Sequence, residues 1–305
     1  MAGNIVALAV LAYLTGHVTG PALARARWTR RHPAVAVALW TSALAGAVLV
    51  LLTLLILLLA WPPGPLHTWI EHLRSCLPGH AHTGELGTLA VAALSAGVVA
   101  WGLGRGTARV SRTIAGRRKH REMVSLVARH PEEPADVRLI EHPAPFVYCL
   151  PGRFRPIVMT TGTLERLDAL QVAAVLEHER AHLRHRHHLL LAVVDALGTA
   201  LPWSRTVRRA RAELPALVEM AADDAAARRH GPVPVIGALR LLAPAPLQPR
   251  DLGANAGPRQ RLEQRIARLE RGTCACRSSA SATAALLMTP LLGAVLIAVL
   301  LRLSC

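Results

Sequence analysis

The residues best suited to chemistry lie in the stretch 177–182, which reads E-H-E-R-A-H. His178 and His182 are four positions apart, so on a helix their imidazoles share one face with Cβ atoms about 5–6 Å apart. That spacing suits two ligands of one tetrahedral Zn²⁺. Glu179 can reach a metal-bound water without taking a coordination position, and it can accept a proton from that water during attack on a peptide carbonyl. The pattern predicts one zinc ion per chain, with Glu179 as the catalytic base.

A zinc ion that keeps one position open for water needs a third protein ligand. The acidic candidates downstream are Asp195, Glu213, Glu219, Asp223 and Asp224. Asp195 lies in an apolar stretch that would carry it beyond the metal, and Glu213 lies among arginines that suggest a surface ion pair. Glu219 and Asp223 are four apart on an alanine-rich helix, so one can coordinate while the other orients a ligand histidine. We predict Glu219 as the third ligand and Asp223 as its supporting carboxylate.

Three further histidines follow the motif, so a solvated, histidine-rich helix end is the alternative explanation of the pattern. We interpret these three as surface residues: His185, His187 and His188. The elements around the motif favour the zinc interpretation. Segments 137–140, 146–150 and 157–161 have the composition of short strands, and Asp168 stands where the N-cap of the motif helix is expected. A small sheet followed directly by a helix with the motif is the context that a zinc peptidase requires.

Four uncharged apolar runs surround this region, at 5–24, 34–61, 86–104 and 282–301. Each is near or above the roughly 20 residues that a helix needs to cross the hydrocarbon layer. Clusters of arginine follow the first and third runs, and such clusters hold their flank in the cytoplasm. Residues 22–24 resemble a signal-peptide cleavage site, but no basic residue precedes the first run, which argues for an uncleaved span.

The predicted fold class is therefore mostly α, with four transmembrane helices and a cytosolic α+β zincin-like domain. Three spans occupy 1–104 with an outer loop at 62–85, the zinc domain occupies 105–280, and the fourth span lies in 281–305. Both termini are expected outside the cell membrane. The peptidase site is expected in the cytoplasm.

Composition supports this organisation. Of 305 residues, 52% are hydrophobic, which excludes a disordered chain. The formal charge of +16 is explained by the arginines beside the spans, which also favour an anionic bilayer surface. With only 3% aromatic residues, the chain lacks the stacking side chains of a nucleic-acid surface, and we expect no direct nucleic-acid binding.

The outer loop holds imidazole and thiol groups that could bind copper or zinc, at His67, His72, Cys76, His80 and His82. A flexible polar loop without metal is the interpretation we favour. A disulfide between Cys76 and Cys305 is an alternative in an oxidising exterior.

Several motifs resemble the BlaR/MecR-type antirepressor metallopeptidases, membrane relatives of the HtpX and CAAX-processing zinc peptidases. The resemblance lies in F-V-Y-C-L-P-G at 146–152, R-P-I-V at 155–158, G-T-L at 162–164, A-V-L-E-H-E-R-A-H at 174–182 and E-M-A-A-D at 219–223. It implies that His178, His182 and Glu219 hold zinc, that Glu179 is the general base and that Asp223 supports the ligands. It also implies an edge strand along which the substrate lies, formed by Ile157, Val158, Met159, Thr160 and Thr161.

The resemblance further implies a cytosolic protein substrate, a winged-helix transcriptional repressor in a signalling pathway. Two departures limit this expectation: only about four residues follow the last apolar run, so no penicillin-binding sensor is expected, and residues 255–258 lack the histidine of related enzymes. The oxyanion-stabilising residue is therefore open, and Arg265 is one candidate. A non-proteolytic zinc-containing receptor and a quality-control protease of membrane proteins are the alternative functions.

Overall fold

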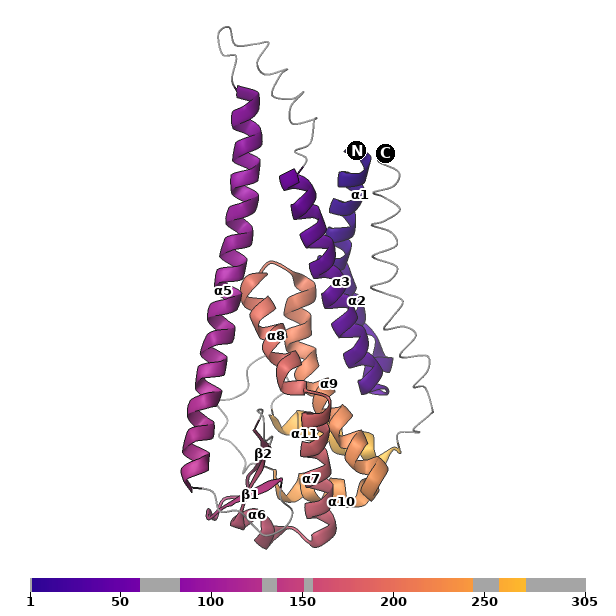
Figure 1. Ribbon diagram of the computed structural model, residues 1–305. Coiled ribbons are helices and arrows are strands. Elements are labelled where there is room, and N and C mark those ends of the chain that lie inside the picture. The colour runs from indigo at the N-terminus through magenta and orange to yellow at the C-terminus, as the bar shows by residue number, and fades with distance from the viewer. Residues whose placement is uncertain (1, 61–82, 128–135, 151–155, 244–257, 273–305) are drawn as a thin grey trace.

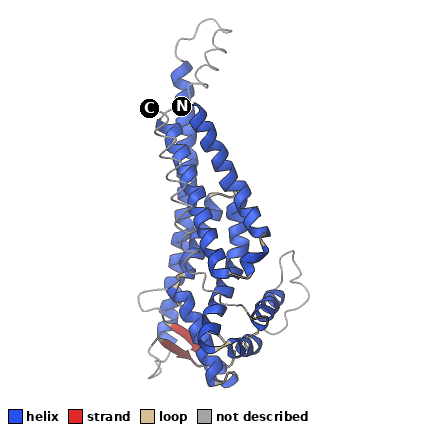
Figure 2. Ribbon diagram, turned by 90° about the vertical axis from the view of Figure 1, so that its right-hand side faces the viewer, coloured by secondary structure: helices blue, strands red, loops and turns tan. Residues whose placement is uncertain are grey.

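A computed structural model describes residues 2–60, 83–127, 136–150, 156–243 and 258–272 of the chain. The outer loop and the fourth predicted span fall almost entirely outside these residues. Figure 2 shows a small sheet at one end of an elongated and otherwise helical molecule. The observed class is mostly α with a small sheet, as the sequence predicts.

The N-terminal helices cover the first two apolar runs. The first run is helical through α1 (Ala2–Tyr13), the π-helical turn η1 (Leu14–Val18) and α2 (Thr19–Arg25), and the short 3₁₀ helix η2 (Arg27–Arg30) leads to α3 (Pro33–Ala60). Among the described residues, two helical segments are long and apolar enough to cross a membrane, Val6–Arg25 and Pro33–Leu55. Both lie in the runs predicted as the first and second spans.

Helix α5 (Thr83–Val127) contains 45 residues, so it is about 68 Å long. Its N-terminal part carries the third apolar run and its C-terminal part the basic segment that follows. In Figure 1 it extends along one side of the molecule, with α1 to α3 on the other side. The third span stays a prediction.

A helical hairpin lies between α5 and α3 and is formed by α8 (His187–Ala200) and the first half of α9 (Arg205–His230). Its core contains the fully buried Trp40 of α3, packed with Val194 of α8 and with Val207 and Leu214 of α9. Asp195 of α8 pairs with arginines of α5 and α9, as expected for a residue far from the metal. The hairpin therefore ties the N-terminal helices to the domain below.

The start of α9 approaches α2 at a glycine. The amide of Gly20 donates to Oγ1 of Thr206 at 3.1 Å, and the same hydroxyl donates to the carbonyl of Thr15 at 2.7 Å. A Cβ at position 20 would lie 2.4 Å from the Cα of Thr206, so only glycine allows this contact. Further along, Pro215 lies inside α9.

The sheet contains β1 (Val137–Ile140), β2 (Val147–Cys149) and β3 (Ile157–Thr160), in the order β1-β3-β2. Strand β3 pairs in parallel with β1 and antiparallel with β2, and all four of its residues are buried. The predicted substrate edge strand at 157–161 is therefore wrong: β3 is central, with both backbone edges paired, and Thr161 already belongs to helix α6 (Thr161–Arg166). Of the two edge strands, β2 is the one that approaches Glu179.

The sheet packs on α7 (Ala169–Arg184), the helix that carries the histidine motif. Ile157 and Met159 of β3 contact Leu176 and Leu183 of α7 in one buried cluster. Asp168 caps the helix as predicted, since its side chain accepts from the amide of Gln171 at 2.8 Å and the Gln171 side chain accepts from the amide of Asp168. Helices α10 (Pro232–Leu241) and α11 (Pro258–Glu270) complete the domain around α9.

Candidate metal centre

Three predicted ligands converge between α7 and α9. The Nε2 atoms of His178 and His182 are 3.1 Å apart, and each lies 3.5 Å from a carboxylate oxygen of Glu219. Zinc–ligand distances of about 2.0–2.1 Å in a tetrahedral site place ligand atoms about 3.3 Å from one another. The observed triangle thus has the dimensions of three zinc ligands around one ion, and no other group of three metal-binding side chains occurs in the described part of the chain.

Small side chains bring the two helices close enough for this convergence. Ala181 of α7 packs on Ala222 and Ala225 of α9 in a buried cluster. Without bulk at these positions the backbones approach closely, so short histidine and glutamate side chains can meet across the interface. The alanine-rich sequence of α9 therefore serves the metal site directly.

A buried carboxylate supports the first histidine ligand. Asp223 has no exposed surface, and its Oδ1 lies 3.1 Å from Nδ1 of His178. Burial opposes the charge of Asp223, but hydrogen bonds with Arg265 and His178 outweigh this effect and hold its pKa below the ordinary value. An Nδ1–H bond to this carboxylate leaves Nε2 of His178 free to coordinate metal.

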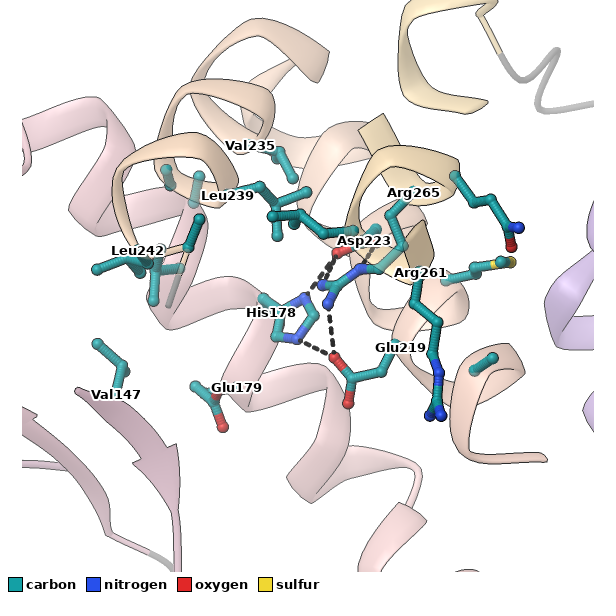
Figure 3. A pocket seen from close by; sticks show the side chains of 18 of the residues that line it. Val147, His178, Glu179, Glu219, Asp223, Val235, Leu239, Leu242, Arg261 and Arg265 are labelled. Carbon is teal, nitrogen blue, oxygen red and sulfur yellow. Dashed lines mark hydrogen bonds and ion pairs between the residues drawn. The ribbon is translucent and has the colours of Figure 1, made fainter. Parts of the chain in front are cut away.

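Arg265 comes from α11 and is engaged by these carboxylates. Its Nε and Nη2 donate to Asp223 at 2.7 Å each, and its Nη1 lies 3.1 Å from Glu219, as the dashed lines in Figure 3 show. All three guanidinium nitrogens thus face either the predicted ligand Glu219 or Asp223, which supports His178. This orientation does not support the predicted role of Arg265 as oxyanion donor and instead makes it a positioning residue.

The second histidine ligand is supported by another histidine. Nδ1 of His187 lies 2.9 Å from Nδ1 of His182. The prediction that His187 is a surface residue is wrong, because it is only 5% exposed. Arg186 adopts the left-handed conformation with φ of 51°, so α7 ends abruptly and α8 begins at once with His187 turned toward the metal centre. His185 is exposed, as predicted, and His188 is half-buried.

His187 is suited to accept a hydrogen bond. Burial, reinforced by repulsion from His182, lowers its pKa to about 4, so it is neutral near pH 7. A neutral ring protonated on Nε2 offers Nδ1 as an acceptor for the Nδ1–H of His182. That bond would direct Nε2 of His182 toward the metal.

The electrostatics at two of the three predicted ligands, His178 and Glu219, favour a cation, whereas burial and repulsion from His178 lower the pKa of His182 to about 4. Burial opposes charge at His178, but hydrogen bonds with Asp223 and Glu219 outweigh it and raise the pKa of His178 to about 10. Burial also opposes charge at Glu219, yet its hydrogen bond with His178 and the nearby cations lower its pKa to about 2. Two ionised carboxylates therefore surround the point where the donors meet, which suits a divalent ion.

Glu179 stands apart from the donors, as its predicted role requires. Burial raises its pKa, which brings a carboxylate closer to the range useful for a general base. The thiol of Cys149, on the edge strand β2, donates to Glu179, and burial raises the thiol pKa to about 12 so that it stays protonated. No local sequence pattern indicates a role for Cys149, because its place beside Glu179 depends on the sheet order.

A cavity of about 520 Å³ opens over this centre. His178, Glu179 and Glu219 line it together with Arg261 and Arg265 (Figure 3). Its apolar part includes side chains of α10 and the residues that follow it, together with others from β2 and α8. The apolar lining includes Val147, Leu191, Val235, Leu239 and Leu242. The centre therefore combines a triangle of side chains that could hold a metal ion, a buried carboxylate beside it and a cavity with a largely apolar lining.

Residues 116–226 match the model of peptidase family M48. The matched range contains the sheet, the motif helix and Glu219 with Asp223, so it supports a metallopeptidase domain of the gluzincin type. Comparisons with curated proteins and with solved structures gave no match. The features particular to the BlaR/MecR type are not addressed by this match.

Proposed function

We propose that the protein is an integral-membrane zinc metalloendopeptidase that hydrolyses a cytosolic protein. The observation that carries the proposal is the triangle of His178, His182 and Glu219. Glu179 lies beside this triangle but does not belong to it. That arrangement leaves one side of the metal position for water. The M48 match over the same residues supports this chemistry.

When bound, zinc would supply a Lewis acid and lower the pKa of a coordinated water to about 7. Glu179 would accept the proton of the attacking water and pass it to the leaving amine. Asp223 would hold the ring of His178, and His187 the ring of His182. Arg265 would hold Asp223 and Glu219 in place between α9 and α11.

The edge strand β2 is the expected binding track for an extended peptide. Within the described residues β2 pairs on one side only, with β3, so its other backbone edge can accept a further strand. Val147 of β2 lines the same cavity as Glu179, so a peptide on this edge would pass the metal. An apolar side chain of the substrate would enter the pocket lined by Val235, Leu239 and Leu242.

The expected setting is a cell membrane crossed four times, with the peptidase domain in the cytoplasm. Two N-terminal helices meet the length and composition of spans, and the arginines of η2 and the C-terminal part of α5 follow the rule for cytoplasmic flanks. By its resemblance to antirepressor peptidases, a winged-helix repressor is the proposed substrate class. This places the reaction in a signalling pathway.

The test is the variant Glu179→Gln in the full-length protein. It should bind one zinc ion per chain and lose proteolysis, because glutamine cannot accept the proton. Proteomics of cells with the native chain or the variant would then identify proteins cut only by the former. Cleavage retained by the variant would refute the assignment, signalling without any cleavage would favour a non-proteolytic receptor, and cuts confined to misfolded membrane proteins would favour quality control.

A further inference from the structure

A second cavity, also of about 520 Å³, lies between η2 and α11. Six basic or imidazole side chains line it: Arg27, Arg30, Arg31, His32, Arg268 and Arg271. The described lining is completed by Met220, Gln264 and Gly272, so it contains no carboxylate. A hollow with this lining selects an anion, because several guanidinium groups converge and, within the described residues, only Arg268 has a carboxylate partner.

The deepest of these groups is incompletely bonded. Arg268 is only 9% exposed, and its Nη2 donates to the carbonyl of Met220 and pairs with Asp224, each at 2.8 Å. Its Nε and Nη1 are buried and have no hydrogen-bond partner among the described residues. A buried donor without an acceptor is costly, so the fold keeps two guanidinium donors ready for an oxygen-rich ligand.

The more exposed arginines are equally available. Arg30 reaches the side-chain oxygen of Gln264 at 3.4 Å, and Nε of Arg271 donates to the carbonyl of Ala267 at 2.9 Å. No ion pair within the described ranges involves Arg27, Arg30, Arg31 or Arg271. Within the described residues, their charges are therefore not neutralised by a carboxylate.

We propose that this cavity binds a phosphate group, which joins η2 to α11. The forked donors of arginine match the oxygens of a phosphate, and several arginines around one hollow suit a group with more than one acceptor. The group can belong to the headgroup of an anionic phospholipid or to a free phosphate. Helix η2 directly follows the first candidate span, which places the cavity at the level expected for headgroups.

The site adjoins the metal centre. Met220 and Gln264 line both cavities, and they are the chain neighbours of the ligand Glu219 and of Arg265. A phosphate bound to Arg268 and Arg30 would fix α11 against η2 and so fix Arg265 against the ligand carboxylates. The binding itself does not depend on peptidase activity and can be measured without a substrate.

The test uses the full-length, zinc-loaded protein in an uncharged detergent. The site variant is Arg30→Gln with Arg271→Gln, two exposed positions where folding should not suffer. The control is Arg112→Gln with Arg209→Gln, two exposed arginines outside the cavity that remove the same charge. Native mass spectrometry would measure retention of phosphatidylglycerol against phosphatidylcholine, and thermal unfolding would measure binding of inorganic phosphate.

We expect the native and control proteins to bind at least one of the two anionic probes, and the site variant to bind it about tenfold more weakly or not at all. Binding of phosphatidylglycerol alone would identify a lipid headgroup site, and binding of inorganic phosphate a site for a free phosphate. Equal affinity of the site and control variants would overturn the proposal. So would a native protein that binds neither probe, or that retains phosphatidylcholine equally well.

Discussion

The hydrogen bond between His187 and His182 can be removed without touching a metal ligand, by the substitution His187→Leu. In the native protein the Nδ1 atoms of the two rings are 2.9 Å apart in a buried setting. Leucine would leave the Nδ1–H of His182 without an acceptor, which costs about 1–3 kcal/mol for a buried donor. Because about 1.4 kcal/mol corresponds to a factor of ten, the affinity for zinc should fall roughly tenfold to hundredfold. Loss of a residue that supports a metal ligand usually lowers metal affinity by a similar factor, about tenfold to hundredfold.

The assay is a competition for zinc between the protein and a chromophoric chelator, followed at pH 7.5 in detergent. The matched control is His185→Leu, which removes an exposed histidine that stacks on His187 but makes no recorded bond to His182. His187→Gln should recover part of the affinity because its amide oxygen can accept. If His187→Leu binds zinc as tightly as the native chain and the control, His187 does not position the ligand and the reasoning is refuted.

Three further perturbations test the fold and the metal. Arg180 holds the pKa of Asp136 below its ordinary 3.8, so the Asp136 carboxylate stabilises the fold above that value and loses the effect as pH falls through its lowered pKa. Near pH 6, Asp136→Asn should therefore lower the free energy of unfolding by about 1 kcal/mol or less, which thermal unfolding would show as a lower Tm. The difference in Tm between the variant and the native chain should disappear in acid. A difference that does not change with pH would contradict a contribution from the ionised Asp136. Gly162→Ala should destabilise by about 1–3 kcal/mol or more in denaturant unfolding, because the new Cβ would lie 2.0 Å from the carbonyl oxygen of Pro143, whereas Gly116→Ala, in open space, should not. A chelator should lower the Tm of the native chain, because it removes the stabilisation that bound zinc gives. That stabilisation is about 4 kcal/mol where free zinc is a thousandfold above its Kd. The Tm of a His178→Ala variant should not change when the chelator is added.

The sequence predicts which side chains share a helix face, because helical periodicity alone places them. His178 and His182, and likewise Glu219 and Asp223, share helix faces at a spacing of four, and the structure brings both pairs together. The cap at Asp168 and the three strand positions follow from equally local signals.

Errors arose where the answer depends on how distant elements pair. The edge strand at 157–161 is implied by the family resemblance alone, and strand composition does not reveal that β3 is central in this sheet. His187 was taken for a surface residue because nothing local indicates the left-handed turn at Arg186 that redirects it. Arg265 is only one candidate for the oxyanion donor in the sequence, and nothing local indicates its partners, which lie more than forty positions earlier, on α9.

The proline within α9 marks a place where this helix can bend. Pro215 has no amide hydrogen, so α9 lacks one backbone hydrogen bond at this residue, which lies four positions before Glu219. Glu219 lies about 6 Å beyond the proline along the axis, so a bend of about 10° would move it by about 1 Å. Zinc sites tolerate displacements of only about 0.2 Å. A bend of α9 at Pro215 would therefore change the metal affinity itself.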